Sequence, residues 1–186
     1  RSSITSSNLD EFFMVRVASL KDMVHANYKK KDIAGMTASE QLEKINERTR
    51  ELVTLQYNTY NRSLVPLMHQ HGIVVMDAFE DLSEAQAAFV DRYFEDNVYP
   101  VLTPMAVDAS RPFPLIRNKT LNIAALLSKK KGKAEKEEIE FATVQVPSVL
   151  PRLVHIPSED GNEKTFILLE QVIERNIDKL FLNYDV

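Results

Sequence analysis

The 186-residue chain contains no cysteine and only four glycines. Without cysteine there is no disulfide, no thiolate nucleophile and no cysteine-ligated zinc, and the composition fits a cytosolic compartment. Four glycines argue against a glycine-rich phosphate loop, and neither GxxxxGK[ST] nor GxGxxG occurs. These absences exclude the short motifs by which many nucleotide-binding proteins are identified.

Long hydrophobic runs and a strong charge of one sign are also lacking. No stretch of about 18 uncharged apolar residues is present, so we expect no transmembrane segment. The formal net charge of -4 argues against a broad nucleic-acid-binding surface, so no nucleic-acid partner is expected. The hydrophobic content of 44% is sufficient for a folded core.

The histidines and hydroxyl residues form no recognisable catalytic pattern. HExxH and GxSxG are both absent, and His69 and His71 are two residues apart, which places them on different sides of a helix. We interpret this pair as surface residues near a helix end. The sequence therefore assigns no catalytic residue and no metal ligand to this chain.

Residues 1–72 are predicted to form an antiparallel helical bundle. Apolar residues at helical spacing predict a first helix from Asn8 to about Tyr28, with Ser7 or Asn8 as its N-cap. Thr37-Ala38-Ser39-Glu40 fits a capping box and begins a second helix that ends at Gly72. A helix of about 30 residues is about 45 Å long and needs a partner helix to cover its apolar face.

Residues 73–186 are predicted to form a mixed α+β domain with a small antiparallel sheet. Ser83-Glu84-Ala85-Gln86 is a second capping box, and its helix should end at Pro100. The apolar run at 73–76 is predicted to be a strand or an extended linker. Apolar and β-branched residues predict strands at 121–127, 139–146, 154–156 and 166–168, followed by a helix at 170–181. Four prolines between 100 and 114 favour irregular extended backbone.

Three local features have both a structural and a binding interpretation. Residues 6–12 fit a polar helix start, although the Asn8 amide could also bind a ligand. Residues 129–138 fit an exposed hairpin tip, although their lysines could bind an anionic polymer. Residues 111–114 fit a rigid connector or a binding loop. On the residues alone, the structural interpretation is favoured in each case.

Five segments, in order along the chain, resemble the conserved motifs of long-chain polyphosphate kinases. They are Ser6–Ala18, Tyr99–Asp108, Arg111–Pro114, Val146–Arg152 and Asn176–Phe181. The resemblance covers nearly the whole chain and implies an N-terminal helical domain followed by part of a head domain. Two phospholipase-D-like catalytic domains would follow beyond Val186.

The resemblance also implies a function. Such an enzyme reversibly transfers the terminal phosphoryl group of ATP to polyphosphate through a phosphohistidine, with Mg²⁺. Its substrates would be ATP or ADP and polyphosphate, it would form a homo-oligomer through the head domain, and it would be cytoplasmic, with membrane association as an alternative. The catalytic histidines would lie outside this chain, which alone would be inactive. Only one site residue is carried over: Asn8, as an ATP-contacting residue that helps to cover the base.

Two other hypotheses stay open from the sequence: a non-catalytic helical adaptor, and a polyphosphate-binding protein without kinase activity. One departure from the family pattern is Arg1-Ser2-Ser3, where members usually have an apolar helix end. We expect these three residues to be a cloning remnant that follows a missing helix.

Overall fold

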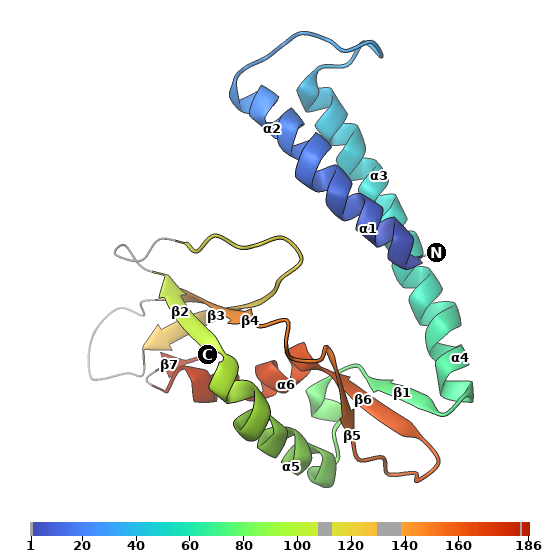
Figure 1. Ribbon diagram of the computed structural model, residues 1–186, viewed down its shortest axis with the longest axis vertical. Helices are drawn as coiled ribbons and strands as arrows, with labels where there is room; N and C mark the ends of the chain where they lie inside the picture. Colours follow the sequence, from blue (N-terminus) through green and yellow to red (C-terminus); the bar gives the residue numbers. More distant parts are fainter. Residues whose placement is uncertain (1, 108–112, 130–138, 183) are drawn as a thin grey trace. The chain divides into compact units, whose positions relative to one another are not determined.

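The computed structural model describes residues 2–107, 113–129, 139–182 and 184–186. The chain divides into two compact units, Arg1–Leu67 and Met68–Val186 (Figure 1). The sequence-based boundary between residues 72 and 73 stays a prediction. The α+β fold class, with helices first and mixed elements second, is confirmed.

The first unit is a pair of long antiparallel helical runs. The first run consists of α1 (Ser2–Phe12), a π-helical segment (Phe13–Val17) and α2 (Ala18–His25). The second consists of α3 (Ala38–Thr59) and a π-helical segment (Tyr60–Leu64), and the helix continues along the chain as α4 (Val65–Gln70). Figure 1 shows α1 and α2 lying along α3. Val17, Leu20 and Ala38 are buried between them.

Local hydrogen bonds determine where α3 begins, as predicted. The Thr37 hydroxyl accepts from the Glu40 backbone N–H, and the Glu40 carboxylate accepts from the Thr37 backbone N–H at 2.7 Å. In the preceding connection, Oδ1 of Asp32 accepts from the backbone N–H groups of Ala34 and Met36, both at 2.9 Å. The helical hairpin is therefore closed by side chains that satisfy the backbone donors of the turn.

The predicted start of the first helix is wrong. Asn8 is not an N-cap, because α1 already begins at Ser2 and passes through Asn8. Serine and asparagine favour caps because their side chains compete for backbone bonds, but tertiary contacts can override that preference. Here the Gln56 side chain of α3 donates to the Ser6 hydroxyl at 3.4 Å, which ties the start of α1 to α3.

The second unit contains two sheets and two principal helices. A three-stranded sheet has the order β1-β6-β5, and a four-stranded antiparallel sheet has the order β2-β4-β3-β7. The strands are β1 (Ile73–Met76), β2 (Thr103–Val107), β3 (Leu121–Lys129), β4 (Ile139–Val146), β5 (Leu153–Ile156), β6 (Lys164–Leu168) and β7 (Tyr184–Asp185). The helices are α5 (Glu84–Tyr93), which continues as a π-helical segment (Phe94–Val98), and α6 (Leu169–Arg175). Short 3-10 turns lie at Phe79–Asp81, Tyr99–Val101 and Ile177–Leu180.

One hydrophobic core joins these helices to the sheets. Val90, Phe94 and Val98 lie on one face of the α5 run and are fully buried. They share the core with Val172 and Ile173 of α6 and with the inward side chains of β3 and β4. Gly72, at φ 69°, lies in the turn immediately before β1, and a Cβ there would lie 3.2 Å from the Asn162 carbonyl oxygen. Glycine therefore suits both the turn and the close approach of the β5–β6 connection.

Three details of the second unit differ from the sequence-based predictions. Thr103–Val107 is a strand, which the sequence analysis missed because of Pro104; this strand lies at a sheet edge, where proline is tolerated. The β1–β6 pair is parallel, so one of the two sheets is mixed. The last helix ends at Arg175 because Asn176 is buried, donates to the Val172 carbonyl at 3.1 Å and leaves helical geometry.

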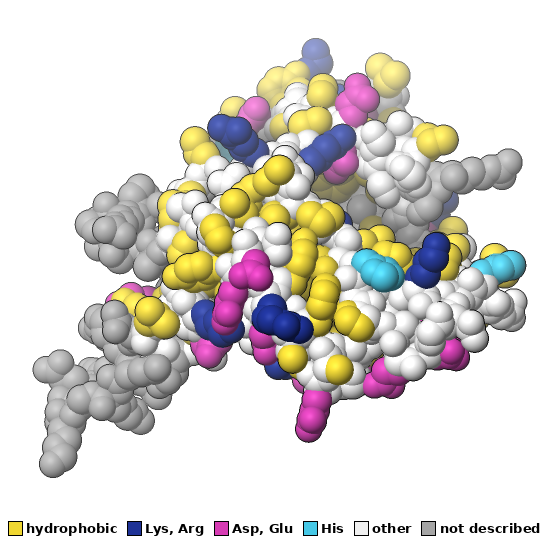
Figure 2. All heavy atoms as spheres, turned by 60° about the horizontal axis from the view of Figure 1, so that its bottom comes forward, with side chains coloured by type: hydrophobic (Ala, Val, Ile, Leu, Met, Phe, Trp, Pro, Cys, Tyr) yellow, Lys and Arg dark blue, Asp and Glu magenta, His cyan; other side chains and the backbone are white. Residues whose placement is uncertain are grey.

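The predicted hairpin tip at 129–138 and the start of the 111–114 connector lie mostly outside the described residues. Within the described part of the chain, no helix is long and apolar enough to cross a membrane. On the face that Figure 2 shows, cationic and anionic side chains are interspersed. Such a mixture is in keeping with the small net charge of the chain.

Candidate functional site

The predicted binding residue Asn8 lies in the middle of α1 with its side chain exposed. Within the described residues, no protein group is hydrogen-bonded to its amide. Helical residues four apart lie on the same face, which places Ile4, Asn8 and Phe12 in one row. Ile4 is 67% exposed and Phe12 is 40% exposed. Asn8 is therefore an amide on an apolar strip that the first unit itself leaves uncovered.

The strip leads directly into an irregular part of the helix. The five residues after Phe12 are π-helical, and π-helical segments inside α-helices are frequent at functional sites. Phe12 and Phe13 pack edge to face with their ring centroids 6.2 Å apart, and Val15 is 66% exposed. The guanidinium of Arg16 donates to the Gln41 side chain at 2.9 Å, which ties this segment to α3. The first unit thus presents two aromatic rings and an amide on one supported helix.

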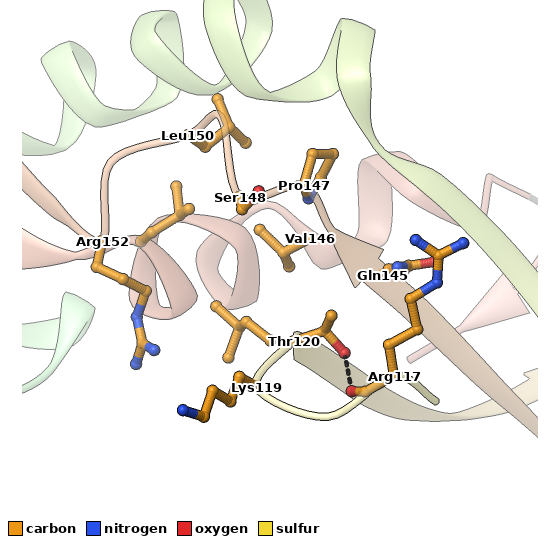
Figure 3. Close-up of a pocket in the computed structure, with 11 residues that line it drawn as sticks. Arg117, Lys119, Thr120, Gln145, Val146, Pro147, Ser148, Leu150 and Arg152 are labelled. Atoms are coloured by element: carbon orange, nitrogen blue, oxygen red, sulfur yellow. Dashed lines mark hydrogen bonds between the residues drawn. The ribbon is translucent and has the colours of Figure 1, made fainter. Parts of the chain in front are cut away.

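A separate hollow in the second unit collects basic side chains. Its volume is about 390 Å³, and its lining includes Arg117, Lys119 and Arg152, with polar atoms from Gln145 and Ser148 (Figure 3). Pairing of Leu121 with Val146 brings the start of β3 next to the end of β4, although the two are far apart in sequence. In the view of Figure 3, Lys119 and Arg152 extend at one end of the hollow, and the Arg117 guanidinium lies beside Gln145 at the other.

Two features hold the walls of this hollow. The Arg152 guanidinium donates through Nε at 3.1 Å and through Nη2 at 2.5 Å to the Glu170 carboxylate, which orients it. The Thr120 hydroxyl donates to the Arg117 carbonyl at 2.7 Å and closes a turn in which Lys119 has φ 60°. That left-handed conformation is uncommon for a residue with a side chain other than asparagine or aspartate. The basic residues are thus on a constrained framework.

The described acid–base groups with shifted pKa values lie elsewhere. The Asp91 carboxylate accepts from Nε of Arg175 at 2.8 Å and from Nη2 at 3.0 Å. Hydrogen bonds from Arg175 lower the pKa of Asp91, and the same bonds raise the pKa of Arg175. Because this pair joins α5 to α6 and lies outside the hollow, it is a structural contact and not part of a site.

The histidines are dispersed and do not form a site. All four are exposed, and His155 packs against the edge of Phe166 with centroids 5.2 Å apart. Among the described residues, no group of three or more His, Asp or Glu side chains could hold a metal ion. The described residues thus supply binding surfaces and no cluster of the metal-binding type.

Comparison with known proteins identifies the family. Residues 2–76 match the family model of the polyphosphate kinase N-terminal domain, and residues 85–186 match that of the polyphosphate kinase middle domain. The chain belongs to the polyphosphate kinase family. Its two matched segments correspond to the N-terminal and middle domains of that family, in the predicted order.

Named relatives show how much of a polyphosphate kinase this chain represents. It is 52% identical over 98% of its length to a polyphosphate kinase of Lactiplantibacillus plantarum, and it covers 24% of that protein. It is 49% identical over 99% of its length to one of Halalkalibacterium halodurans and covers 26% of it. The crystal structure of polyphosphate kinase from Porphyromonas gingivalis matches the whole chain with a TM-score of 0.80 at 27% identity, over 26% of that structure. The chain thus spans about a quarter of the length of these relatives.

The sequence pointed to only one of these two surfaces. Asn8 was assigned to ATP through the family resemblance, since its local pattern favoured a helix cap over a binding residue. The basic hollow was missed because its residues come from segments about 30 positions apart that meet through strand register. A usable signal was Asn118-Lys119, since asparagine near a strand start favours a tight turn.

Proposed function

We propose that this chain is the nucleotide-positioning and assembly part of an enzyme that reversibly transfers the terminal phosphoryl group of ATP to polyphosphate through a phosphohistidine. Membership of the polyphosphate kinase family supports the reaction class. The nucleophilic histidine and the residues that bind Mg²⁺ would belong to the rest of the protein. The contribution of this segment would be to orient the nucleotide, and the second unit would take part in homo-oligomer contacts.

The observation that carries the binding role is the position of Asn8 inside a helix. An asparagine at a helix start has a structural purpose, because its side chain satisfies backbone donors. An exposed asparagine inside a helix does not act as a cap, and it costs about 0.5 kcal/mol relative to alanine. Asn8 also lies in one row with the exposed apolar residues Ile4 and Phe12. This combination favours an external partner for the Asn8 amide over a role in the stability of α1.

The surroundings of Asn8 suit a nucleobase. Its amide offers two N–H donors and a carbonyl acceptor, which complement the donor and acceptor edge of adenine. Phe12, one turn later and 40% exposed, offers a ring against which a base can pack. A base held there would leave the phosphates to the rest of the enzyme, in keeping with the lack of a phosphate loop in this chain.

The test is steady-state kinetics of the full-length enzyme with Asn8→Ala and Asn8→Asp. We expect the KM for ATP to rise several-fold in both variants. The aspartate loses the N–H donors and adds a negative charge, and the alanine loses both donors and acceptor. The matched control is Asn46→Ala, which makes the same change at an exposed position inside α3.

The stability of the same variants separates binding from structure. Asn8→Ala should leave Tm unchanged or raise it slightly, because alanine is the better helix former. An unchanged KM in both Asn8 variants would show that the residue does not contact ATP. If instead oligomer formation or partner binding changed while the KM did not, the strip would serve protein contacts, as the adaptor hypothesis requires.

A further inference from the structure

We propose that Asp160 and Gly161, in the connection between β5 and β6, form a site of spontaneous covalent modification at which the aspartate converts to isoaspartate. Asp160-Gly161 is the only place in the sequence where an aspartate or an asparagine precedes a glycine. A glycine in the second position hinders ring closure least, because it carries no Cβ and has the widest choice of backbone angles. The reaction needs only water and is independent of any activity of the parent enzyme.

The chemistry has two balanced steps. In the first, the Gly161 backbone nitrogen forms a bond to Cγ of the protonated Asp160 side chain. The C–O bond to the carboxyl hydroxyl breaks, and that hydroxyl leaves with the N–H proton as one molecule of water. In the second, water opens the five-membered succinimide ring. Addition at Cγ restores aspartate, and addition at the former backbone carbonyl carbon gives isoaspartate, in which the main chain runs through the side chain and contains one extra methylene.

The first observation that supports this site is its accessibility. Asp160 and Gly161 are both exposed, in the loop that joins β5 to β6 at the end of the three-stranded sheet (Figure 1). Apart from its chain neighbours, no described atom lies within 4 Å of the position that a Cβ would take at Gly161. The glycine is also outside the left-handed region, unlike Gly72. Packing therefore neither blocks ring closure nor requires a glycine here.

The second observation is a set of hydrogen bonds that polarise the reacting groups. The Asp160 carbonyl oxygen accepts from the Ser158 hydroxyl at 2.5 Å and from the Glu163 backbone N–H at 3.0 Å. Because this carbonyl shares its peptide group with the Gly161 nitrogen, both bonds draw electron density from that nitrogen, and its N–H loses a proton more readily. Oδ1 of Asp160 accepts from the Asn162 backbone N–H at 3.2 Å, which makes Cγ more electrophilic.

Conversion at this site would disturb a tertiary contact of the second unit. The Lys164 backbone N–H donates to the Gly72 carbonyl at 2.7 Å, and the Asn162 carbonyl oxygen lies 3.2 Å from the position of a Cβ at Gly72. An extra methylene two residues before Asn162 shifts that carbonyl against the turn that precedes β1. We therefore expect the isoaspartyl form to have a lower Tm of the second unit than the original form.

The experiment is incubation of the 186-residue chain at physiological temperature and neutral pH, with samples taken over several weeks. Each sample is digested, and isoaspartate is located by mass spectrometry with electron-transfer fragmentation and counted by enzymatic methylation of isoaspartyl carboxyl groups. We expect isoaspartate to accumulate at residue 160, and the Tm of the second unit to fall as the converted fraction rises. Absence of isoaspartate at residue 160, under conditions in which the chain unfolded in urea forms it, would overturn the proposal.

Two variants separate the contribution of the fold from that of the dipeptide. Gly161→Ala should fold normally, because its Cβ enters open space, and should slow the conversion several-fold. Ser158→Ala leaves the reacting dipeptide intact but removes one polarising bond, so it should slow the conversion in the folded chain and not in urea. The control Ser148→Ala makes the same change at an exposed position outside this connection and should leave the rate unchanged. Equal rates for the folded parent and folded Ser158→Ala would contradict the role given to the hydrogen bonds and overturn the proposal.

Discussion

The two capping boxes differ in one residue, Glu40 in the first and Gln86 in the second, and this difference yields a sharp prediction. Gln86 is only 5% exposed. Its carbonyl accepts from the Ser83 backbone N–H at 3.1 Å, and its amide donates to the Pro157 carbonyl at 2.9 Å. Glu40 is exposed, and hydrogen bonds from the Thr37 backbone and hydroxyl lower the pKa of its carboxyl. The perturbation is Gln86→Glu.

Two effects of Gln86→Glu oppose each other. A carboxylate keeps the acceptor for Ser83 and gains about 0.3–1 kcal/mol from the helix dipole. It also loses the donor to Pro157, which costs about 1–3 kcal/mol at a buried position, and it places a charge against a carbonyl oxygen with little solvent. The second effect is larger, so we expect a net loss of about 2 kcal/mol at pH 7.

Calorimetry measures this loss as a fall in the Tm of the second unit by roughly 5–10 °C. Lowering the pH should shrink the deficit, because a protonated carboxyl regains an O–H donor for Pro157. The control Glu40→Gln, at the exposed capping box, should change Tm only slightly. A Gln86→Glu variant as stable as the parent at pH 7 would refute the reasoning that burial decides between the two residues.

Three further predictions follow from the same structure. Because Arg175 lowers the pKa of Asp91, this pair stabilises the fold above about pH 4, and the stabilisation disappears as the pH falls through the lowered pKa. Asp91→Asn should therefore cost about 1 kcal/mol at pH 7 and make the free energy of unfolding depend less on pH below about pH 4. An unchanged pH dependence in that range would contradict this prediction. Phe94→Ala should cost about 3–5 kcal/mol in urea unfolding, since the ring is fully buried in the core. The isolated chain should not become labelled by radioactive ATP, and an acid-labile phosphohistidine on it would show that a nucleophile had been overlooked.

Local chemistry made part of the fold predictable. Thr37 and Ser83 each begin a helix because a hydroxyl and a carboxylate or amide three residues later satisfy backbone donors within one turn. The strands at 121–129 and 139–146 were predictable from their β-branched residues and from the alternation of apolar and polar side chains, a pattern typical of strands with one buried face. These features depend on neighbours within about four residues, so a single sequence contains them.

Features that depend on distant contacts were not predictable in this way. The start of α1 at Ser2 depends on α3, as the Ser6–Gln56 contact shows. The strand at Pro104 is allowed only because it lies at a sheet edge, a position that the local sequence does not reveal. The basic hollow requires the register between β3 and β4, and Arg152 joins it only through the chain that follows β4. Strand register therefore limited the site prediction more than residue chemistry did.

The parallel pairing of β1 with β6 has a consequence for synthesis on the ribosome. Ile73 pairs with Lys164, so β1 is made about 90 residues before its partner. At roughly 5 to 20 residues per second, the apolar segment Ile73–Met76 waits roughly 5 to 20 s without a strand to pair with. During that time it is an unpaired strand, the kind of segment that aggregates or recruits chaperones. Any shortened form of the second unit that keeps Ile73–Met76 must therefore also keep Lys164–Leu168.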